Sequence, residues 1–175
     1  MPNIRLGPLE IRRLTKTYAR QHALALLQIH NTIPYVEWDG TALLAGSSET
    51  AQYVDKWKHS RVIVDLRNEI PVGLMVAYLR GPRSIFAAPS LYLHRGALDE
   101  SVRRTGVGRM LFEHCLYSVA LEERWVTLQT NFEDKNLWLI DFYRRLGFED
   151  AGKIYYPNKT DILMVYDRWN EQATL

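Results

Sequence analysis

The stretch Arg103-Arg104-Thr105-Gly106-Val107-Gly108-Arg109 decides how this sequence is interpreted. It lies between a β-rich run at 91–98 and a run with apolar residues at helical spacing from Val107. A strand-to-helix junction directs several unpaired backbone N–H groups at one point, and its glycines let an anion approach the backbone. The flanking arginines can pair with phosphate oxygens. The stretch therefore predicts a phosphate-binding loop.

Spacing excludes two other glycine-rich motifs. A dinucleotide-binding fingerprint requires a third glycine at the position of Leu111, and a P-loop requires Gly-Lys followed by Ser or Thr, which the chain lacks. A basic glycine turn that only caps a helix has the same local pattern. From this motif alone, both a phosphate site and a simple cap stay open.

Strand and helix patterns continue on both sides of the loop. Before it we expect, in chain order, a strand over 11–14, a helix capped by Thr15 or Thr17 and ended by Pro34, a second helix from Ser47 or Ser48, a hairpin of 62–66 with 72–79, and a strand over 91–98. After it we expect a helix with Val107, Met110, Leu111, Cys115 and Val119 on one side, a strand over 125–130, a helix marked by Leu139, Phe142, Tyr143 and Leu146 with Gly147 as a left-handed cap, and a hairpin of 148–156 with 162–166. This order predicts an α/β fold with a mixed sheet and helices on both faces.

Composition limits the classes of function. The chain has 175 residues, 47% of them hydrophobic, which predicts a single domain over 1–175. A net charge of +2, from 22 basic and 20 acidic side chains, gives no strong field for nucleic acid or an anionic membrane. The single Cys115 forms no internal disulfide, and no metal-ligand spacing is present. We therefore expect a soluble, cytoplasmic protein that holds no metal and binds neither nucleic acid nor membrane.

The glycine loop resembles the pyrophosphate-binding loop of the GNAT superfamily of N-acetyltransferases. The pattern of that loop, Arg/Gln-x-x-Gly-x-Gly/Ala, is met by Arg103, Gly106 and Gly108. The resemblance covers nearly the full chain and is most specific over 91–148. It implies a GNAT-like central mixed, mostly antiparallel sheet of about seven strands flanked by about four helices.

A second stretch is similar to a later motif of the same superfamily, Asn-x-x-x-x-x-Phe-Tyr-x-x-x-Gly-Phe. Asn136, Phe142-Tyr143 and Gly147-Phe148 match it. The chain departs from the pattern at Leu139, where a small alanine is usual. The larger side chain narrows the cofactor groove slightly but removes no catalytic group.

The resemblance implies an acetyl-CoA-dependent N-acetyltransferase, without a metal, that acts on a primary amine of a small molecule or peptide by direct transfer in a ternary complex. A catalytically silent acyl-CoA-binding regulatory module and a protein N-terminal or lysine acetyltransferase stay open as alternatives. A homodimer is possible through the exposed edge of the final hairpin. The cofactor-binding residues that the resemblance implies are Ala97, Leu98, Arg103, Arg104, Thr105, Gly106, Val107, Gly108, Arg109, Asn136 and Tyr143.

Three side chains are candidates for catalysis. The resemblance places Tyr143 at the position of the general acid, although it also lies on an apolar helix stripe typical of a core aromatic. His94 is a candidate base, because two-residue alternation puts it on one face with Tyr92 and Leu98; a packed sheet histidine is the alternative. Glu37, in the loop after the first helix, is a second candidate base or amine-attracting group, and an exposed acid that only aids solubility is its alternative.

Overall fold

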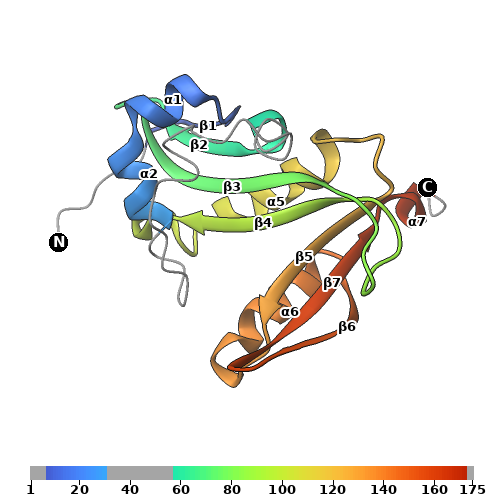
Figure 1. The fold of residues 1–175 in the computed structure, drawn as a ribbon. Coiled ribbons are helices and arrows are strands. Elements are labelled where there is room, and N and C mark those ends of the chain that lie inside the picture. The colour runs from blue at the N-terminus through green and yellow to red at the C-terminus, as the bar shows by residue number, and fades with distance from the viewer. Residues whose placement is uncertain (1–6, 31–56, 173–175) are drawn as a thin grey trace.

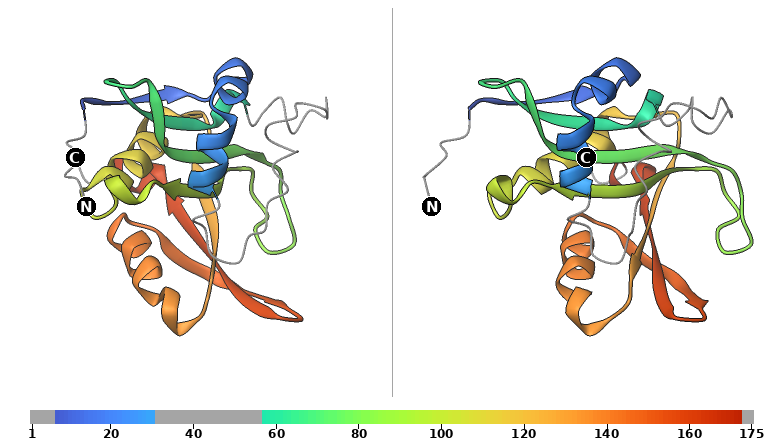
Figure 2. Two further views of the ribbon diagram at one scale, coloured as in Figure 1. Left: turned by 90° about the vertical axis from the view of Figure 1, so that its left-hand side faces the viewer. Right: turned by 60° about the vertical axis from the view of Figure 1, so that its left-hand side comes forward.

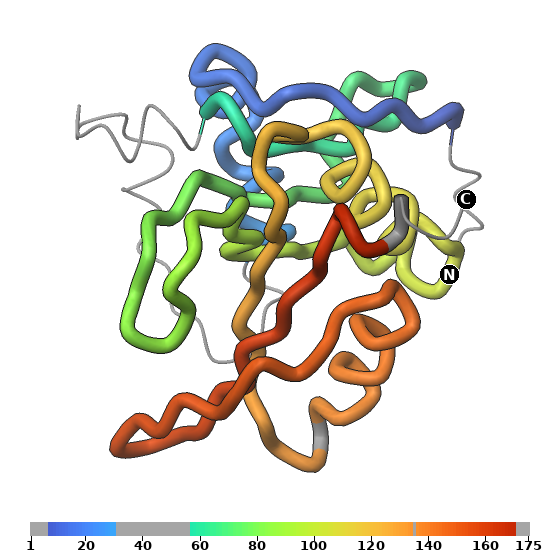
Figure 3. The backbone as a smooth tube through the Cα atoms, turned by 90° about the vertical axis from the view of Figure 1, so that its right-hand side faces the viewer, coloured from blue at the N-terminus to red at the C-terminus, as the bar shows by residue number. Residues whose placement is uncertain are grey.

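The computed structural model describes residues 7–30 and 57–172. These residues form a single seven-stranded sheet of order β1-β2-β3-β4-β5-β7-β6 with helices packed against it (Figure 1 and Figure 3). The strands are β1 (Leu9–Arg13), β2 (Arg61–Asp65), β3 (Ile70–Arg80), β4 (Ser90–Leu98), β5 (Trp125–Asn131), β6 (Glu149–Tyr156) and β7 (Lys159–Asp167). The helices of these residues are α1 (Lys16–Gln21), α2 (Ala23–His30), α5 (Val107–Ser118), α6 (Leu137–Arg145) and α7 (Arg168–Gln172). Neighbouring strands are antiparallel except β4 and β5, which are parallel. The predicted mixed, mostly antiparallel sheet is confirmed.

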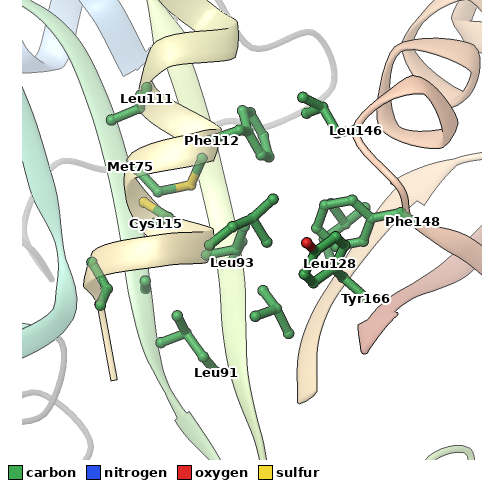
Figure 4. Packing of buried hydrophobic residues seen from close by; sticks show 14 of the residues in the cluster. Met75, Leu91, Leu93, Leu111, Phe112, Cys115, Leu128, Leu146, Phe148 and Tyr166 are labelled. Carbon is green, nitrogen blue, oxygen red and sulfur yellow. The ribbon is translucent and has the colours of Figure 1, made fainter. Parts of the chain in front are cut away.

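Successive side chains of β2 and β3 point to opposite faces of the sheet, so the core consists of two layers. Ile63 and Met75 belong to the cluster beneath α5 and α6, whereas Val62 and Leu74 belong to the cluster beneath α1 and α2. Figure 2 shows the blue helices α1 and α2 on one side of the sheet and the yellow helix α5 on the other. In Figure 4 the apolar side chains of α5, among them Phe112, point toward those of the strands. Both faces of the sheet are therefore covered.

The sequence predicted one continuous helix after β1, and this prediction is wrong. Thr15 caps the helix as expected, since the Thr15 hydroxyl accepts a hydrogen bond from the Tyr18 backbone N–H at 3.1 Å. The helix breaks at His22, whose φ of −115° and ψ of 26° leave the helical region and separate α1 from α2. The His22 ring stacks on that of Tyr18 with centroids 4.2 Å apart. The predicted end at Pro34 lies outside the described residues, as does the predicted start of the next helix at 47–48.

The end of α6 matches its prediction. Gly147 has a φ of 93°, its N–H donates to the Arg144 carbonyl at 2.9 Å, and the Phe148 N–H donates to the Tyr143 carbonyl at 3.1 Å. This pair of bonds is the left-handed helix ending in which glycine avoids the steric cost of a side chain. It places Phe148 against the ring of Tyr143 at the start of the last hairpin.

The turn after α5 is held by a side chain from the far end of the chain. The Arg168 guanidinium donates to four main-chain carbonyls, those of Cys115, Val119, Ala120 and Glu123, over 2.5–2.9 Å. Two of these carbonyls end the helix and have no partner within it. Arg168 thus joins the end of β7 to the end of α5.

Replacing Arg168 with methionine is expected to lower the free energy of unfolding by about 3 kcal/mol, because four carbonyls lose a charged donor. Urea denaturation measures this difference. The control is Arg13→Met, which removes an exposed guanidinium from the edge strand β1 and is expected to change stability by less than about 0.5 kcal/mol. Equal stability of the two variants would contradict the role given to Arg168.

Candidate functional site

β4 and β5 separate after a short stretch of pairing. They pair only at Leu91 with Val126, Tyr92 with Thr127, and Leu93 with Leu128, after which both strands continue without further pairing to each other. Figure 1 shows the two strands diverging below this point. Gly96 is exposed although it lies in the middle of the sheet. Among the described residues, no strand pairs with this side of β4 from residue 94 to 98, so the main-chain groups that point to this edge are available to a ligand.

A β-bulge in β4 corrects the predicted arrangement of side chains. Val76 of β3 pairs with Arg95 and Ala77 pairs with Leu93, so His94 is the extra residue. His94 lies on the same face as Tyr92, as predicted, with ring centroids 5.6 Å apart. The prediction that Leu98 shares this face is wrong: it packs against the core cluster beneath α5. The inserted residue shifts the alternation by one position beyond it.

The loop before α5 forms an open cradle of main-chain N–H groups. Gly106 is the N-cap with a φ of 89°, no side chain caps the helix, and the first turn holds no acidic residue. A Cβ at Gly106 would meet nothing within 4 Å. The Thr105 hydroxyl is turned away, since it donates to the Val102 carbonyl at 2.6 Å. A cap of this kind leaves its N–H groups to a ligand, and the positive end of the helix favours an anion such as a diphosphate.

Val107 and Gly108 set the position of this cradle. The Val107 side chain is buried in the core. A Cβ at Gly108 would lie 3.2 Å from the Leu98 Cδ1, which is closer than ordinary packing. Glycine here lets α5 approach the end of β4 closely, so that the cradle lies beside the open strand edge.

The three arginines of the loop are in different situations. The Nε and Nη2 atoms of Arg103 each donate to the Leu98 carbonyl at 3.2 Å, so this side chain fixes the loop to β4. Arg109 pairs with Glu113 at 2.7 Å along α5. Arg104, with a φ of 61°, is exposed and makes no ion pair with any residue that the structure describes. Of the three, Arg104 has its guanidinium available for a phosphate.

Tyr143 lies on α6 within a group of aromatic rings. Its centroid is 5.3 Å from that of Phe112 on α5 and 6.1 Å from that of Phe148. Burial raises the pKa of the Tyr143 phenol above its ordinary value. In the part of the chain that the structure covers, no group hydrogen-bonds its hydroxyl. The ring is thus packed as a core aromatic would be, while the hydroxyl keeps its proton at neutral pH and has no hydrogen-bond partner among the described residues.

Asn136 precedes α6 and contacts the end of β5. Its Nδ2 donates to the Asn131 Oδ1 at 3.4 Å. This bond joins the start of α6 to the strand that borders the opening. Glu37, the other predicted catalytic residue, lies outside the described residues.

The face of β3 and β4 that carries His94 holds further aromatic and basic groups. The ring centroids of His94 and Tyr78 are 5.6 Å apart. The Arg80 guanidinium carbon lies 3.9 Å from the centroid of the Tyr92 ring. Burial raises the pKa of Tyr92 to about 12. Arg95 reaches His30 of α2, with Nη1 and Nε2 2.9 Å apart. Sequence patterns missed Arg95, because alternation from Leu93 assigns it to the opposite face.

The described ranges 7–30 and 57–172 contain no group of His, Cys, Asp and Glu that could hold a metal ion. Among their helices, none is long and apolar enough to cross a bilayer.

Known proteins resemble this chain in sequence and in fold. It is 26% identical over 92 residues to the peptidyl-lysine N-acetyltransferase YjaB of Salmonella typhimurium, a match that covers 53% of this chain and 59% of that relative. The chain thus aligns with less than two thirds of the relative's length. Its fold matches a chain of the NatC complex bound to Gag peptide and CoA with a TM-score of 0.72 and 14% identity, over 91% of this chain and 98% of that one. It matches the ribosomal-protein-S18-alanine N-acetyltransferase of Escherichia coli with a TM-score of 0.67 and 18% identity, over 91% and 94%.

The family model described as the acetyltransferase (GNAT) family matches residues 23–148. That range includes the open edge of β4, the cradle before α5 and the aromatic group around Tyr143. The chain belongs to the GNAT acetyltransferase family.

Proposed function

We propose that this protein transfers the acetyl group of acetyl-CoA to a primary amine of a small molecule or peptide, by direct transfer in a ternary complex. The observation that carries the proposal is the opening between β4 and β5, which ends at the uncapped start of α5. An extended chain with a diphosphate at one end fits this combination of a free strand edge and an anion cradle. Acetyl-CoA supplies the acetyl group as a reactive thioester.

Different residues around the opening would bind different parts of acetyl-CoA. The N–H groups of residues 104–109 and the Arg104 guanidinium would hold the diphosphate. Because the Asp99 N–H donates to the Val72 carbonyl, alternation turns the main chain of Ala97 toward β3 and that of Gly96 and Leu98 toward the opening. There Gly96 and the Leu98 N–H would pair with the amide groups of the ligand and stabilise negative charge on the reacting carbonyl oxygen. Asn136 keeps α6 beside the end of β5 and so borders the same opening.

Proton transfer is assigned to two side chains on opposite faces of the sheet. The Tyr143 hydroxyl, from the side of α5 and α6, donates a proton to the leaving thiolate. The His94 imidazole, from the side of α2, accepts a proton from the incoming amine, directly or through water.

The acceptor class has support from relatives. YjaB of Salmonella typhimurium is named a peptidyl-lysine N-acetyltransferase, and several proteins with a similar fold were solved with a peptide or a bisubstrate analogue. These names favour a peptide or protein amine within the broader proposal. A silent CoA-binding module would need neither the Tyr143 hydroxyl nor a base.

We further propose a cytoplasmic setting, which suits the free Cys115. We also propose that two copies pair through the exposed edge strand β6.

Two measurements test the proposed function. Calorimetry with CoA and acetyl-CoA measures binding, and thiol release over a panel of amines and peptides measures transfer. We expect heat with both ligands and acceptor-dependent thiol release. Heat without release from any acceptor would favour the silent module, and the absence of heat would contradict the proposal altogether.

Cys115 provides a check on direct transfer. The thiol is fully buried in α5, and burial raises its pKa to about 12, so it is neither accessible nor ionised at neutral pH. We expect no reaction of the native protein with a thiol-specific chromogenic disulfide, and one equivalent of reaction after denaturation. Cys115→Ala is expected to keep transferase activity. Rapid labelling of the native thiol, with loss of transfer, would indicate a covalent intermediate instead.

The pH dependence of turnover follows from Tyr143. The neutral phenol is the form that donates a proton, and burial raises its pKa above the usual value near 10. The Tyr143 phenol therefore stays protonated to a higher pH than an ordinary tyrosine. For this reason kcat is not expected to fall through loss of this proton between pH 7 and about pH 10. A pH profile of the wild type measures this. A decline with a midpoint near pH 8 that Tyr143→Phe abolishes would contradict it.

A further inference from the structure

The guanidinium of Arg95 is a half-buried cation that no acid neutralises within the described structure. The side chain forms no ion pair with any described carboxylate. Burial lowers the pKa of Arg95, which reflects the cost of removing the cation from water, but an arginine stays protonated. A partly desolvated cation is costly to fold unless an anion meets it. A guanidinium without a described acid beside it is therefore a candidate for binding an anionic group of a ligand.

The β-bulge places this cation on the face of His94. Without the extra residue, alternation from Leu93 would point Arg95 toward α5 and away from α2. With it, Arg95 lies beside the end of α2, within reach of His30. Bulges next to active sites serve to redirect a side chain in this way.

His30 contacts the Arg95 guanidinium through one of its N–H groups and leaves the others to a ligand. Arginine only donates, so the His30 Nε2 that lies 2.9 Å from Nη1 must accept, and the His30 ring is neutral in this arrangement. This bond uses one of the five N–H donors, and no other of them bonds a described residue. The others are enough for the two parallel bonds that a guanidinium forms with a carboxylate.

Where the structure describes them, the groups packed around Arg95 are neutral or basic. Tyr78 of β3 and Tyr92 of β4 are its electrostatic neighbours, and Arg80 lies over the Tyr92 ring. Asp161 of β7 is the described acid that acts electrostatically on Tyr92, and its Oδ2 already binds the Lys159 ammonium at 2.9 Å. The described residues therefore give the face that carries the candidate base a positive charge, which disfavours a purely cationic acceptor.

We propose that Arg95 binds a carboxylate of the acceptor, so that the substrate is an amine with a carboxylate close to the reacting nitrogen. The carboxylate is either the α-carboxylate of an amino acid or an acidic side chain at the start of a peptide. This inference rests on the proposed function and specifies its substrate class. Arg95 acts on binding and orientation, while the proton transfers stay with Tyr143 and His94.

Matched acceptor pairs that differ only in the carboxylate test the proposal. One arm compares amino acids with their α-amides, and the other compares amide-capped peptides that begin with Asp or Glu with those that begin with Asn or Gln. Thiol release gives kcat/KM for each member, in the wild type and in Arg95→Met and Arg95→Lys. Because amine basicity differs within a pair, the informative quantity is the change of the carboxylate-to-amide ratio between proteins.

We expect the wild type to favour the carboxylate member in one arm, which identifies its source, and Arg95→Met to reduce that ratio about 10- to 100-fold. Arg95→Lys, which keeps the charge but not the two parallel bonds, is expected to fall between them. Arg13→Met, on the exposed edge strand β1, is the control and is expected to keep the wild-type ratio.

The outcomes separate this inference from the function on which it rests. Transfer to amines with equal ratios in the wild type and Arg95→Met would overturn the role of Arg95 and leave the acetyltransferase intact. An absence of transfer to every carboxylate member would also overturn it, and calorimetry with CoA on the same samples then shows whether the proposed function fails with it.

Discussion

Replacing Gly106 with valine is expected to weaken CoA binding about 100-fold, close to 3 kcal/mol. Gly106 holds a φ of 89°, a region that a β-branched residue avoids, and the space where a Cβ would stand is open to the ligand. Valine would both shift the main-chain N–H groups away from the diphosphate and occupy its approach. Isothermal titration calorimetry with CoA measures the change in the dissociation constant.

Gly152→Val is the matched control for this change. Gly152 lies in the exposed strand β6 with a φ of 142°, and a Cβ there also meets nothing within 4 Å. Both variants carry the backbone cost of a side chain in a region that favours glycine, about 1–2 kcal/mol, so a similar loss of stability is expected in each. Only Gly106→Val should lose affinity. Equal CoA affinity in the two variants would contradict the assignment of the cradle.

Replacing Tyr143 with phenylalanine is expected to reduce kcat by about 10²-fold or more, which is the usual contribution of a positioned general acid. The packing of the ring against Phe112 and Phe148 is kept, and the hydroxyl makes no hydrogen bond within the described structure. The free energy of unfolding is therefore expected to stay within about 0.5 kcal/mol of the wild type. Steady-state thiol release measures kcat, and thermal or urea unfolding measures stability.

Tyr117→Phe separates catalysis from packing. The Tyr117 hydroxyl lies 3.1 Å from that of Tyr166, so its loss is expected to cost about 1 kcal/mol of stability without affecting kcat. Tyr143→Phe should show the opposite pattern. Full activity in Tyr143→Phe would assign this tyrosine to the core alone and leave the departing thiolate to be protonated from solvent.

The order of the strands and the glycine-rich start of α5 were predictable because both depend on local patterns. The cap at Thr15, the left-handed ending at Gly147 and the glycines of the loop each have a cause within a few neighbouring residues. The helices between the middle strands predicted a mixed sheet, and β4 with β5 is its parallel pair. These features agree with the structure.

The remaining features depend on contacts between distant segments. The β-bulge at His94 arises from the register between β4 and β3, and nothing in β4 alone marks the extra residue. The four carbonyls that Arg168 binds come from the end of α5 and the turn after it, far earlier in the chain. The break at His22 is local but has no glycine or proline to indicate it. Alternation and helical spacing describe regular elements, and each of these cases is a departure from regularity.

The side chain that closes the end of α5 also has a consequence for biosynthesis. A ribosome releases α5 into solution well before it adds Arg168, so during that interval the last carbonyls of the helix are left to water. The anion cradle at the other end of the same helix is therefore expected to become rigid late, when β7 has entered the sheet. Nascent chains stalled before position 168 should be more sensitive to protease in this region than chains stalled after it.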